Sequence, residues 1–247
     1  MLNNIIKFFS YIIFWSSKRR RNFRSKMKSF LCSPFEKNNT LILITDKGEK
    51  RIKRYYSKKI HIEVIGFNNV VKIPQNAHYN NCKIIIKGNN NHIEINNTKN
   101  DVKFDIYSQY VNNTKMIIGK NVSSVGTKIH ICEDNAELII GDDCMLSYGV
   151  EIWPSDAHTI VDKDTKKLLN RVCKPVIIGN HCWLGCKAII TKNARLPNNT
   201  IVGAGSVVCK PFEQEYIAIA GNPAKIVKED VDWARCKAHD YTEDIQE

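Results

Sequence analysis

Aliphatic residues recur at a strict interval of six in the C-terminal half of this 247-residue chain. The positions are Ile178, Leu184, Ile190, Leu196, Val202 and Val208. Small or turn-compatible residues follow them, among them Gly179, Gly185 and Gly203. An α-helix has no period of six, and a two-residue strand period alone does not select every third inward position. A chain that turns a corner every six residues, with glycine easing the corner, has this pattern and is typical of a parallel β-helix.

The same repeat occurs upstream, out of phase with the first run. Its positions are Ile140, Leu146 and Ile152, and Ile152 lies 26 residues before Ile178, two more than a multiple of six. Residues 153–175 must therefore leave the coil as a loop. Long loops expelled from a rigid scaffold often carry function, although an insertion without a role is the alternative.

The positive charge is confined to one segment. The chain has 37 Lys and Arg against 25 Asp and Glu, a net charge of +12, and residues 18–59 alone account for 15 basic and 3 acidic side chains. Residues 60–247 are close to neutral. We therefore expect no nucleic-acid surface across the fold.

An apolar opening precedes the basic segment, and residues 1–28 predict an amphipathic helix on an anionic membrane surface. A solvated extension is the equal alternative. The apolar part is short for a membrane span, and its charges follow rather than precede it, which fits a secretory signal poorly. We expect a cytoplasmic protein, at the inner face of the cell membrane if residues 1–28 bind lipid. The nine scattered cysteines, without a CxxC pair, favour reduced thiols.

Four regions follow from these patterns. Residues 1–37 form the amphipathic and basic extension, 38–115 irregular β or β-helix coils with Asn-rich corners, 116–228 the regular β-helix, and 229–247 an acidic tail that we expect to be helical or frayed.

Three blocks carry a family resemblance: residues 176–185, 202–208 and 220–225. In order and spacing they resemble the hexapeptide-repeat acyltransferases, and the resemblance covers roughly residues 115–235. Within that family, residues 140–146, 156–158, 179–183, 197–199 and 223–229 are most similar to the O-acetyltransferases of sialic-acid capsular polysaccharides. Residues up to about 60 have no counterpart that we can place.

The resemblance implies a fold, a reaction and an assembly. The fold is all-β, a left-handed parallel β-helix with a protruding active-site loop, a short basic or helical N-terminal extension and a short C-terminal helix. The reaction is acetyl transfer from acetyl-CoA to a hydroxyl of a cell-surface glycan, a capsular polysaccharide or sialic acid. The assembly is a homotrimer with active sites between neighbouring subunits, and no metal is expected.

The resemblance also assigns site residues. His158, in the loop, is the general base, which suits an imidazole that titrates near neutral pH. Asp156 either orients that imidazole or caps its own turn. Trp183 precedes the inward Leu184, so it points outward, and by resemblance it flanks the acetyl-CoA or acceptor site. A backbone N–H near Gly185 is the implied oxyanion donor.

The remaining assignments concern the co-substrate and the acceptor. The candidates for acetyl-CoA binding are Trp183, Gly185, Lys187, Gly203, Ala204, Gly205, Lys210 and Lys225. The glycines allow the pantetheine arm to approach the backbone, and the lysines are point charges for phosphates. Tyr148 and Trp153 flank the entrance to the loop, where aromatic faces suit either sugar rings or subunit packing.

The sequence leaves three alternative hypotheses open. In the first, the acceptor is another sugar, such as a lipopolysaccharide or O-antigen unit. In the second, the chain is a γ-class carbonic anhydrase, with His130, His158 and His181 as zinc ligands across subunits. In the third, it is an inactive membrane-bound scaffold, and the intact His158 loop argues against this hypothesis.

Overall fold

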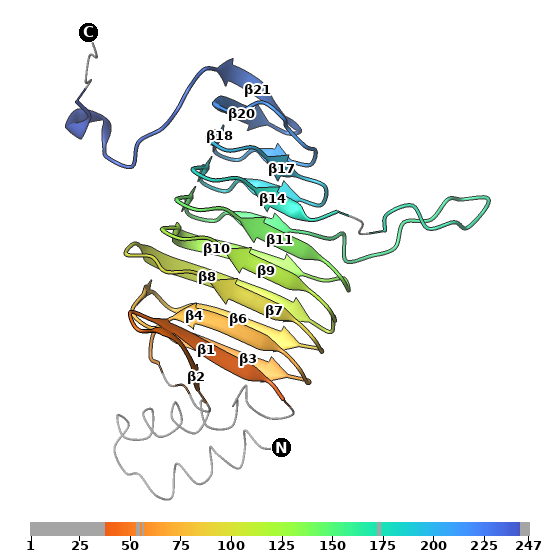
Figure 1. Ribbon diagram of the computed structural model, residues 1–247. Helices are drawn as coiled ribbons and strands as arrows, with labels where there is room; N and C mark the ends of the chain where they lie inside the picture. The colour runs from red at the N-terminus through yellow and green to blue at the C-terminus, as the bar shows by residue number, and fades with distance from the viewer. Residues whose placement is uncertain (1–37, 53–54, 56, 172–173, 243–247) are drawn as a thin grey trace, which may run out of the picture.

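The computed structural model describes residues 38–52, 55, 57–171 and 174–242, which form one continuous coil of strands (Figure 1). The segment 1–37, including the predicted membrane-surface helix, lies outside the described residues.

One sheet runs the length of the coil as a stack of parallel strands, closed at one end by an antiparallel strand. Its order is β2 (Gly48–Ile52), β1 (Thr40–Thr45), β4 (Val70–Pro74), β7 (His92–Ile95), β9 (Lys115–Ile118), β11 (Glu137–Ile140), β14 (Val176–Ile178) and β17 (Arg195–Leu196). We call this the first face.

The other sheet bends over two faces. The second face holds β12 (Met145–Leu146), β15 (Trp183–Leu184), β18 (Thr200–Val202) and β20 (Ile217–Gly221), with β21 (Ala224–Glu229) antiparallel at its end. The third face holds β3 (Ile60–Ile65), β6 (Cys82–Lys87), β13 (Glu151–Trp153), β16 (Ile189–Thr191) and β19 (Val207–Val208). The nine-residue strands β8 (Asp101–Gln109) and β10 (Ser123–Ile131) cross both faces, and β5 (His78–Tyr79) pairs with the start of β8.

The three faces enclose an aliphatic core, as the six-residue repeat predicts. All six repeat positions from Ile178 to Val208 are at most 2% exposed. Within the strands that carry them, such as β14 and β18, buried and more exposed side chains alternate, because successive residues of a strand point to opposite faces. The predicted left-handed parallel β-helix is confirmed.

The length of each turn changes along the coil. Side-chain hydrogen bonds join equivalent corners, and their partners are 22 residues apart for Asn68 and Asn90, but 18 apart for Asn180 and Asn198. Eighteen residues are three six-residue units, so only the C-terminal turns show the strict repeat. Strand pairing is nevertheless continuous across residue 115, through β7, β9 and β11.

The tail after β21 differs from the helical or frayed segment that we expected. Residues 230–237 are irregular, and the short C-terminal helix is a single 3₁₀ turn, η1 (Ala238–Asp240). Trp233 is only 8% exposed, so this segment is docked against the coil. No helix in the described part of the chain is long and apolar enough to cross a membrane.

Candidate active site

The phase break of the repeat is an expelled loop. The turn that carries it separates the paired corner residues Asp142 and Asn180 by 38 positions instead of 18. The loop leaves the prism after β13, projects from it and returns to β14 (Figure 1). An antiparallel bridge between Val161 and Leu168 closes its outer part.

The base of the loop is pinned by a small polar network. The Asn170 amide donates to the Asp156 carboxylate (2.9 Å) and to the carbonyl of His158 (2.7 Å), while its oxygen accepts from the N–H of Ile160 (2.8 Å). Lys192, from the next turn, donates to the Asp156 carboxylate and to the carbonyl of Asn170 (3.1 Å). Five hydrogen bonds between residues of two turns therefore fix the backbone around His158.

Asp156 is an ionised anchor of this network. Partial burial acts to raise the pKa of its carboxyl, but hydrogen bonds from Lys192 and Asn170 and the charge of Lys192 outweigh burial and hold the pKa below its usual value. Within the described residues, its contacts go to these two partners and not to the imidazole of His158. In this chain Asp156 holds the loop; an orienting role toward His158 stays a prediction.

His158 lies exposed beside an open cavity of about 430 Å³. The cavity is bounded by the pinned loop and by the corner of the preceding turn, which contributes Glu133 and Asp134. Arg171 lines it from the returning arm of the loop. An imidazole so placed is open to a ligand, and the cavity offers carboxylates to hydroxyl groups and a guanidinium to an anion.

Trp183 points outward from β15, as predicted, and is 36% exposed. Its indole N–H donates to the hydroxyl of Ser147 (3.2 Å), and its ring lies 6.3 Å from that of Trp233 at 47°. The indole is thus held on one side by Ser147, which follows β12, and on the other side by the C-terminal segment.

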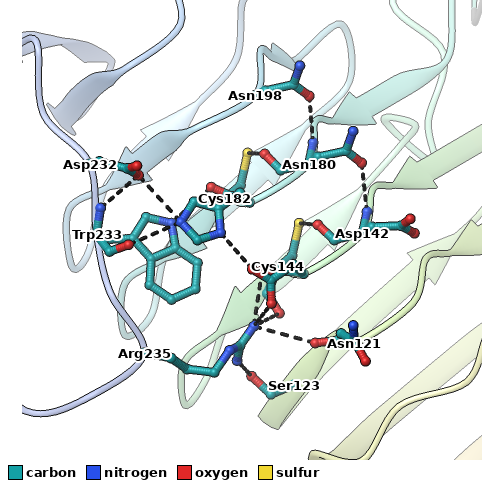
Figure 2. Close-up of polar contacts among 12 residues, drawn as sticks. Asn121, Ser123, Asp142, Cys144, Asn180, Cys182, Asn198, Asp232, Trp233 and Arg235 are labelled. Atoms are coloured by element: carbon teal, nitrogen blue, oxygen red, sulfur yellow. Dashed lines mark hydrogen bonds and ion pairs between the residues drawn. The ribbon is translucent and has the colours of Figure 1, made fainter.

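That segment, residues 232–235, crosses the corner between the first and second faces, and we call it the strap (Figure 2). The indole of Trp233 stacks on His181 at 4.4 Å and donates to the carbonyl of His181 (2.9 Å). Arg235 donates to the carboxylate of Asp143 (2.9 Å) and the hydroxyl of Ser123 (2.7 Å). One short segment thus bridges three successive turns.

The imidazole of His181 is the centre of the strap contact. Its Nδ1 lies 2.7 Å from the carboxylate of Asp143, and its Nε2 lies 3.0 Å from the carbonyl of Trp233 and 3.4 Å from Asp232. Partial burial lowers the pKa of His181, but these hydrogen bonds and the two carboxylate charges outweigh burial, so the pKa is raised. His181 and Asp143 therefore favour the ion pair.

Five of the predicted co-substrate residues lie at the corner between the second and third faces: Gly185, Lys187, Gly203, Ala204 and Gly205. Lys187 donates through its N–H to the carbonyl of Tyr148 (2.9 Å), and Gly205 to that of Cys186 (2.8 Å). A Cβ on Gly185 would lie 2.7 Å from the backbone nitrogen of Ala204, so these corners stack too closely for a side chain there. Gly203 follows on the next turn and donates to Ile219 (2.8 Å).

The implied oxyanion donor lies at this corner, whereas two of the predicted phosphate-binding lysines lie away from it. The N–H of Gly185 donates to Val202 (2.8 Å), so that particular N–H is already engaged. Lys225 lies on β21 opposite Ala220, beyond Gly203. Lys210 lies past β19, with its ammonium 5.4 Å from the ring of Phe212.

Trp153 stacks on His130 (4.1 Å), which stacks in turn on Tyr107 (5.3 Å), along the third face. Burial lowers the pKa of His130. With His130 inside this stack and both nitrogens of His181 engaged, two of the three histidines of the zinc alternative have other partners. Within the described residues, no group of three or more His, Cys, Asp or Glu side chains is arranged to hold a metal ion.

The structure therefore brings the candidates together in two groups. His158, Asp156 and the cavity lie at the corner between the third and first faces. Trp183 lies on the second face, and the stacked glycines lie at the corner between the second and third faces. No contact among the described residues joins the two groups, so one chain alone does not bring His158 to the glycine corner.

A three-sided left-handed β-helix built on six-residue repeats, with a histidine-bearing loop expelled from one turn, defines a hexapeptide-repeat acyltransferase. No protein-family model matches the chain. It is 34% identical to the polysialic acid O-acetyltransferase of Neisseria meningitidis over 194 residues, which cover 70% of this chain and 89% of that relative. The chain belongs to the polysialic acid O-acetyltransferase family.

Two further comparisons agree. The polysialic acid O-acetyltransferase of Escherichia coli O1:K1 / APEC is 34% identical over 122 residues, 49% of this chain but only 39% of that relative's length. The crystal structure of the polySia specific acetyltransferase NeuO superposes with a TM-score of 0.66 at 31% identity, covering 74% of this chain and 82% of that one.

Sequence reasoning missed the residues that hold the site. Asn170 and Lys192 contact Asp156 from 14 and 36 positions away, and the strap contacts its corner across 52 or more. One signal was available: a tryptophan, Trp233, in an acidic tail favours docking over fraying.

Proposed function

We propose that this protein transfers an acetyl group from acetyl-CoA to a hydroxyl of a sialic-acid-containing capsular polysaccharide. The observation that carries the proposal is His158, exposed beside an open cavity on a pinned loop, in a chain that matches polysialic acid O-acetyltransferases. Acetyl transfer of this kind needs a base for the attacking hydroxyl, and we assign this role to His158.

The proposed reaction has one proton cycle. The imidazole of His158 accepts the proton of the acceptor hydroxyl as its oxygen attacks the thioester carbon. The C–O bond forms and the C–S bond breaks through a tetrahedral intermediate. The imidazolium then donates the proton to the departing thiolate, so the histidine returns to its neutral form. Asp156, Asn170 and Lys192 keep the loop backbone in place throughout.

We also propose a homotrimer in which neighbouring subunits complete each site. Support comes from the separation of the two candidate groups within one chain. In this arrangement the loop with His158 meets a neighbour's second face, where Trp183 and the glycine corner with Gly203 hold the thioester. Lys187, Lys210 and Lys225 provide cations for the phosphates of the co-substrate.

The test is mass spectrometry of polysialic acid incubated with acetyl-CoA and purified enzyme. We expect His158→Ala to lower turnover by about 10²–10⁴-fold, the usual contribution of a general base. The matched control is His78→Ala, which removes a largely exposed histidine far from the loop. Light scattering checks that both variants keep the wild-type assembly. Near-native turnover in His158→Ala would exclude this mechanism, and acetylation of other glycans alone would exclude the acceptor.

A further inference from the structure

Exposed aromatic side chains lie along the corner that leads to the His158 cavity. Between the third and first faces, Tyr110 is 81% exposed and Phe67 is 46% exposed. The ammonium of Lys87 lies 5.5 Å from the centre of the Tyr110 ring. These three residues belong to turns on the N-terminal side of the loop.

A hydrogen-bond ladder places these residues relative to the cavity. The N–H of Phe67 donates to Asn89 (3.1 Å), that of Asn89 to Asn112 (3.0 Å), and that of Asn112 to Asp134 (2.7 Å). Asp134 lines the cavity beside His158. With turns spaced like neighbouring strands, at about 4.8 Å, Phe67 lies roughly 15 Å from the turn of Asp134, and Tyr110 one turn from it.

The corner is rigid because its backbones nearly touch. A Cβ on Gly66 would lie 1.8 Å from the carbonyl oxygen of Gly88, and one on Gly88 would lie 1.9 Å from that of Val111. Beneath the corner, buried Asn69 and Asn91 hydrogen bond from turn to turn (3.0 Å). The aromatic rings are therefore mounted on a preorganised support.

Tyr110 combines an exposed ring with an unfavourable backbone conformation. Its φ of 63° is in the left-handed region, which costs a non-glycine residue about 1–2 kcal/mol. Most other described non-glycine residues at positive φ are asparagine or aspartate, which tolerate it better. A strained, bulky and exposed ring is a reason to look for a ligand.

The chemistry of the corner suits an acidic sugar chain. The face of an exposed aromatic ring packs against the C–H face of a pyranose, and the ammonium of Lys87 beside Tyr110 suits a sugar carboxylate. Closer to His158, Glu133 and Asp134 accept hydrogen bonds from sugar hydroxyls, and Arg171 meets a second carboxylate.

We propose that Phe67, Lys87 and Tyr110 form an extended acceptor subsite, which begins one turn from the turn of Asp134 and holds an acidic polysaccharide beyond the sugar residue that is acetylated at His158. This inference rests on the proposed function and adds to it a location and a dependence on acceptor length.

The test compares two acceptors in the intact enzyme: a long sialic-acid polymer and the shortest oligomer that the wild type acetylates. We expect Tyr110→Ala to raise KM for the polymer about tenfold, the loss of roughly 1.4 kcal/mol of binding, with kcat unchanged. KM for the short oligomer changes less, because fewer of its sugar residues lie along the subsite. Tyr110→Phe retains most of the polymer affinity.

The matched control is Tyr216→Ala. Tyr216 is also an aromatic at positive φ (56°) and 46% exposed, but it lies at the corner between the first and second faces. Lys87→Gln is expected to raise KM for the polymer mainly at low salt, with the exposed Lys228→Gln as its control.

Three outcomes would overturn the inference. In the first, Tyr110→Ala and Tyr216→Ala affect the polymer equally; in the second, Tyr110→Ala affects both acceptors equally. In the third, Tyr110→Ala changes the oligomeric state, which would make this corner a contact between copies of the chain. A wild-type enzyme inactive on every sialylated acceptor would instead refute the proposed function.

Discussion

Asn170 allows a direct test of how the loop is held. Replacing it by alanine removes two donated hydrogen bonds, to Asp156 and to the carbonyl of His158, and one accepted from Ile160. At about 1 kcal/mol for each bond, and with partial replacement by water, the pinned loop loses roughly 2–3 kcal/mol. The ratio of pinned to released loop then falls about 30–150-fold.

The core of the β-helix is untouched by this change, so activity and global stability should separate. We expect kcat/KM for acetyl transfer in Asn170→Ala to fall by at least about tenfold, because His158, the proposed base, is no longer held beside the cavity. Hydrogen exchange at the amide of Ile160 should accelerate at the same time. The melting temperature should change little.

The control for Asn170→Ala is Asn198→Ala. Asn198 accepts from the N–H of Asn180 (2.8 Å) and donates to Glu215 (2.8 Å), at a corner away from the loop. That variant loses a similar number of bonds and should lose stability while acetyl transfer stays near wild type. If Asn170→Ala keeps kcat/KM within about twofold of the wild type, with unchanged exchange at Ile160, the pinning argument is wrong.

Three further predictions concern the strap, the loop base and the N-terminal segment. Because the pKa of His181 is raised in the fold, its contribution to strap stability is complete below about pH 6.5 and is lost as pH rises through the raised value. Hydrogen exchange in the strap should therefore speed up with pH beyond the intrinsic rate, and His181→Asn should abolish this excess; an excess that persists would contradict the assignment. Lys192→Gln leaves Asp156 without its cation and should lower kcat with little change in KM for acetyl-CoA, whereas Lys167→Gln, at the exposed loop tip, should change neither; equal effects would argue against anchoring. Deleting residues 1–28 should release the protein from anionic liposomes and leave activity on soluble acceptor intact; unchanged co-sedimentation would refute membrane binding.

The sequence predicts the parts of the fold that repeat locally. The inward positions around Ile190, the outward Trp183 and the expelled loop follow from periodicity, because one strict six-residue period fixes which side chains enter the core. The N-terminal turns are harder to predict, since 22 residues per turn are not a multiple of six. In these turns the Asn-rich corners, such as the one at Gly88 and Asn89, were the remaining sequence signal for a coil.

The contacts that hold the site are not periodic, and for that reason they escaped prediction. Lys192 reaches Asp156 because a corner of the next turn passes beneath the loop, which requires knowing the stacking of turns. Arg235 reaches Asp143 across 92 positions, and no local pattern encodes such a contact. Periodicity thus predicts the prism, while three-dimensional proximity decides how its loop and tail are fixed.

The two antiparallel strands at the ends of the prism limit how far it extends. A stack of parallel turns ends in backbone N–H and C=O groups that would pair with any similar strand. Here β2 folds back on β1 on the first face, and β21 folds back on β20 on the second face (Figure 1). On that one face at each end, the outermost described strand runs against the direction of the coil. A second molecule that stacked end to end would meet a strand of the wrong direction there, which opposes parallel growth of the coil into a fibre.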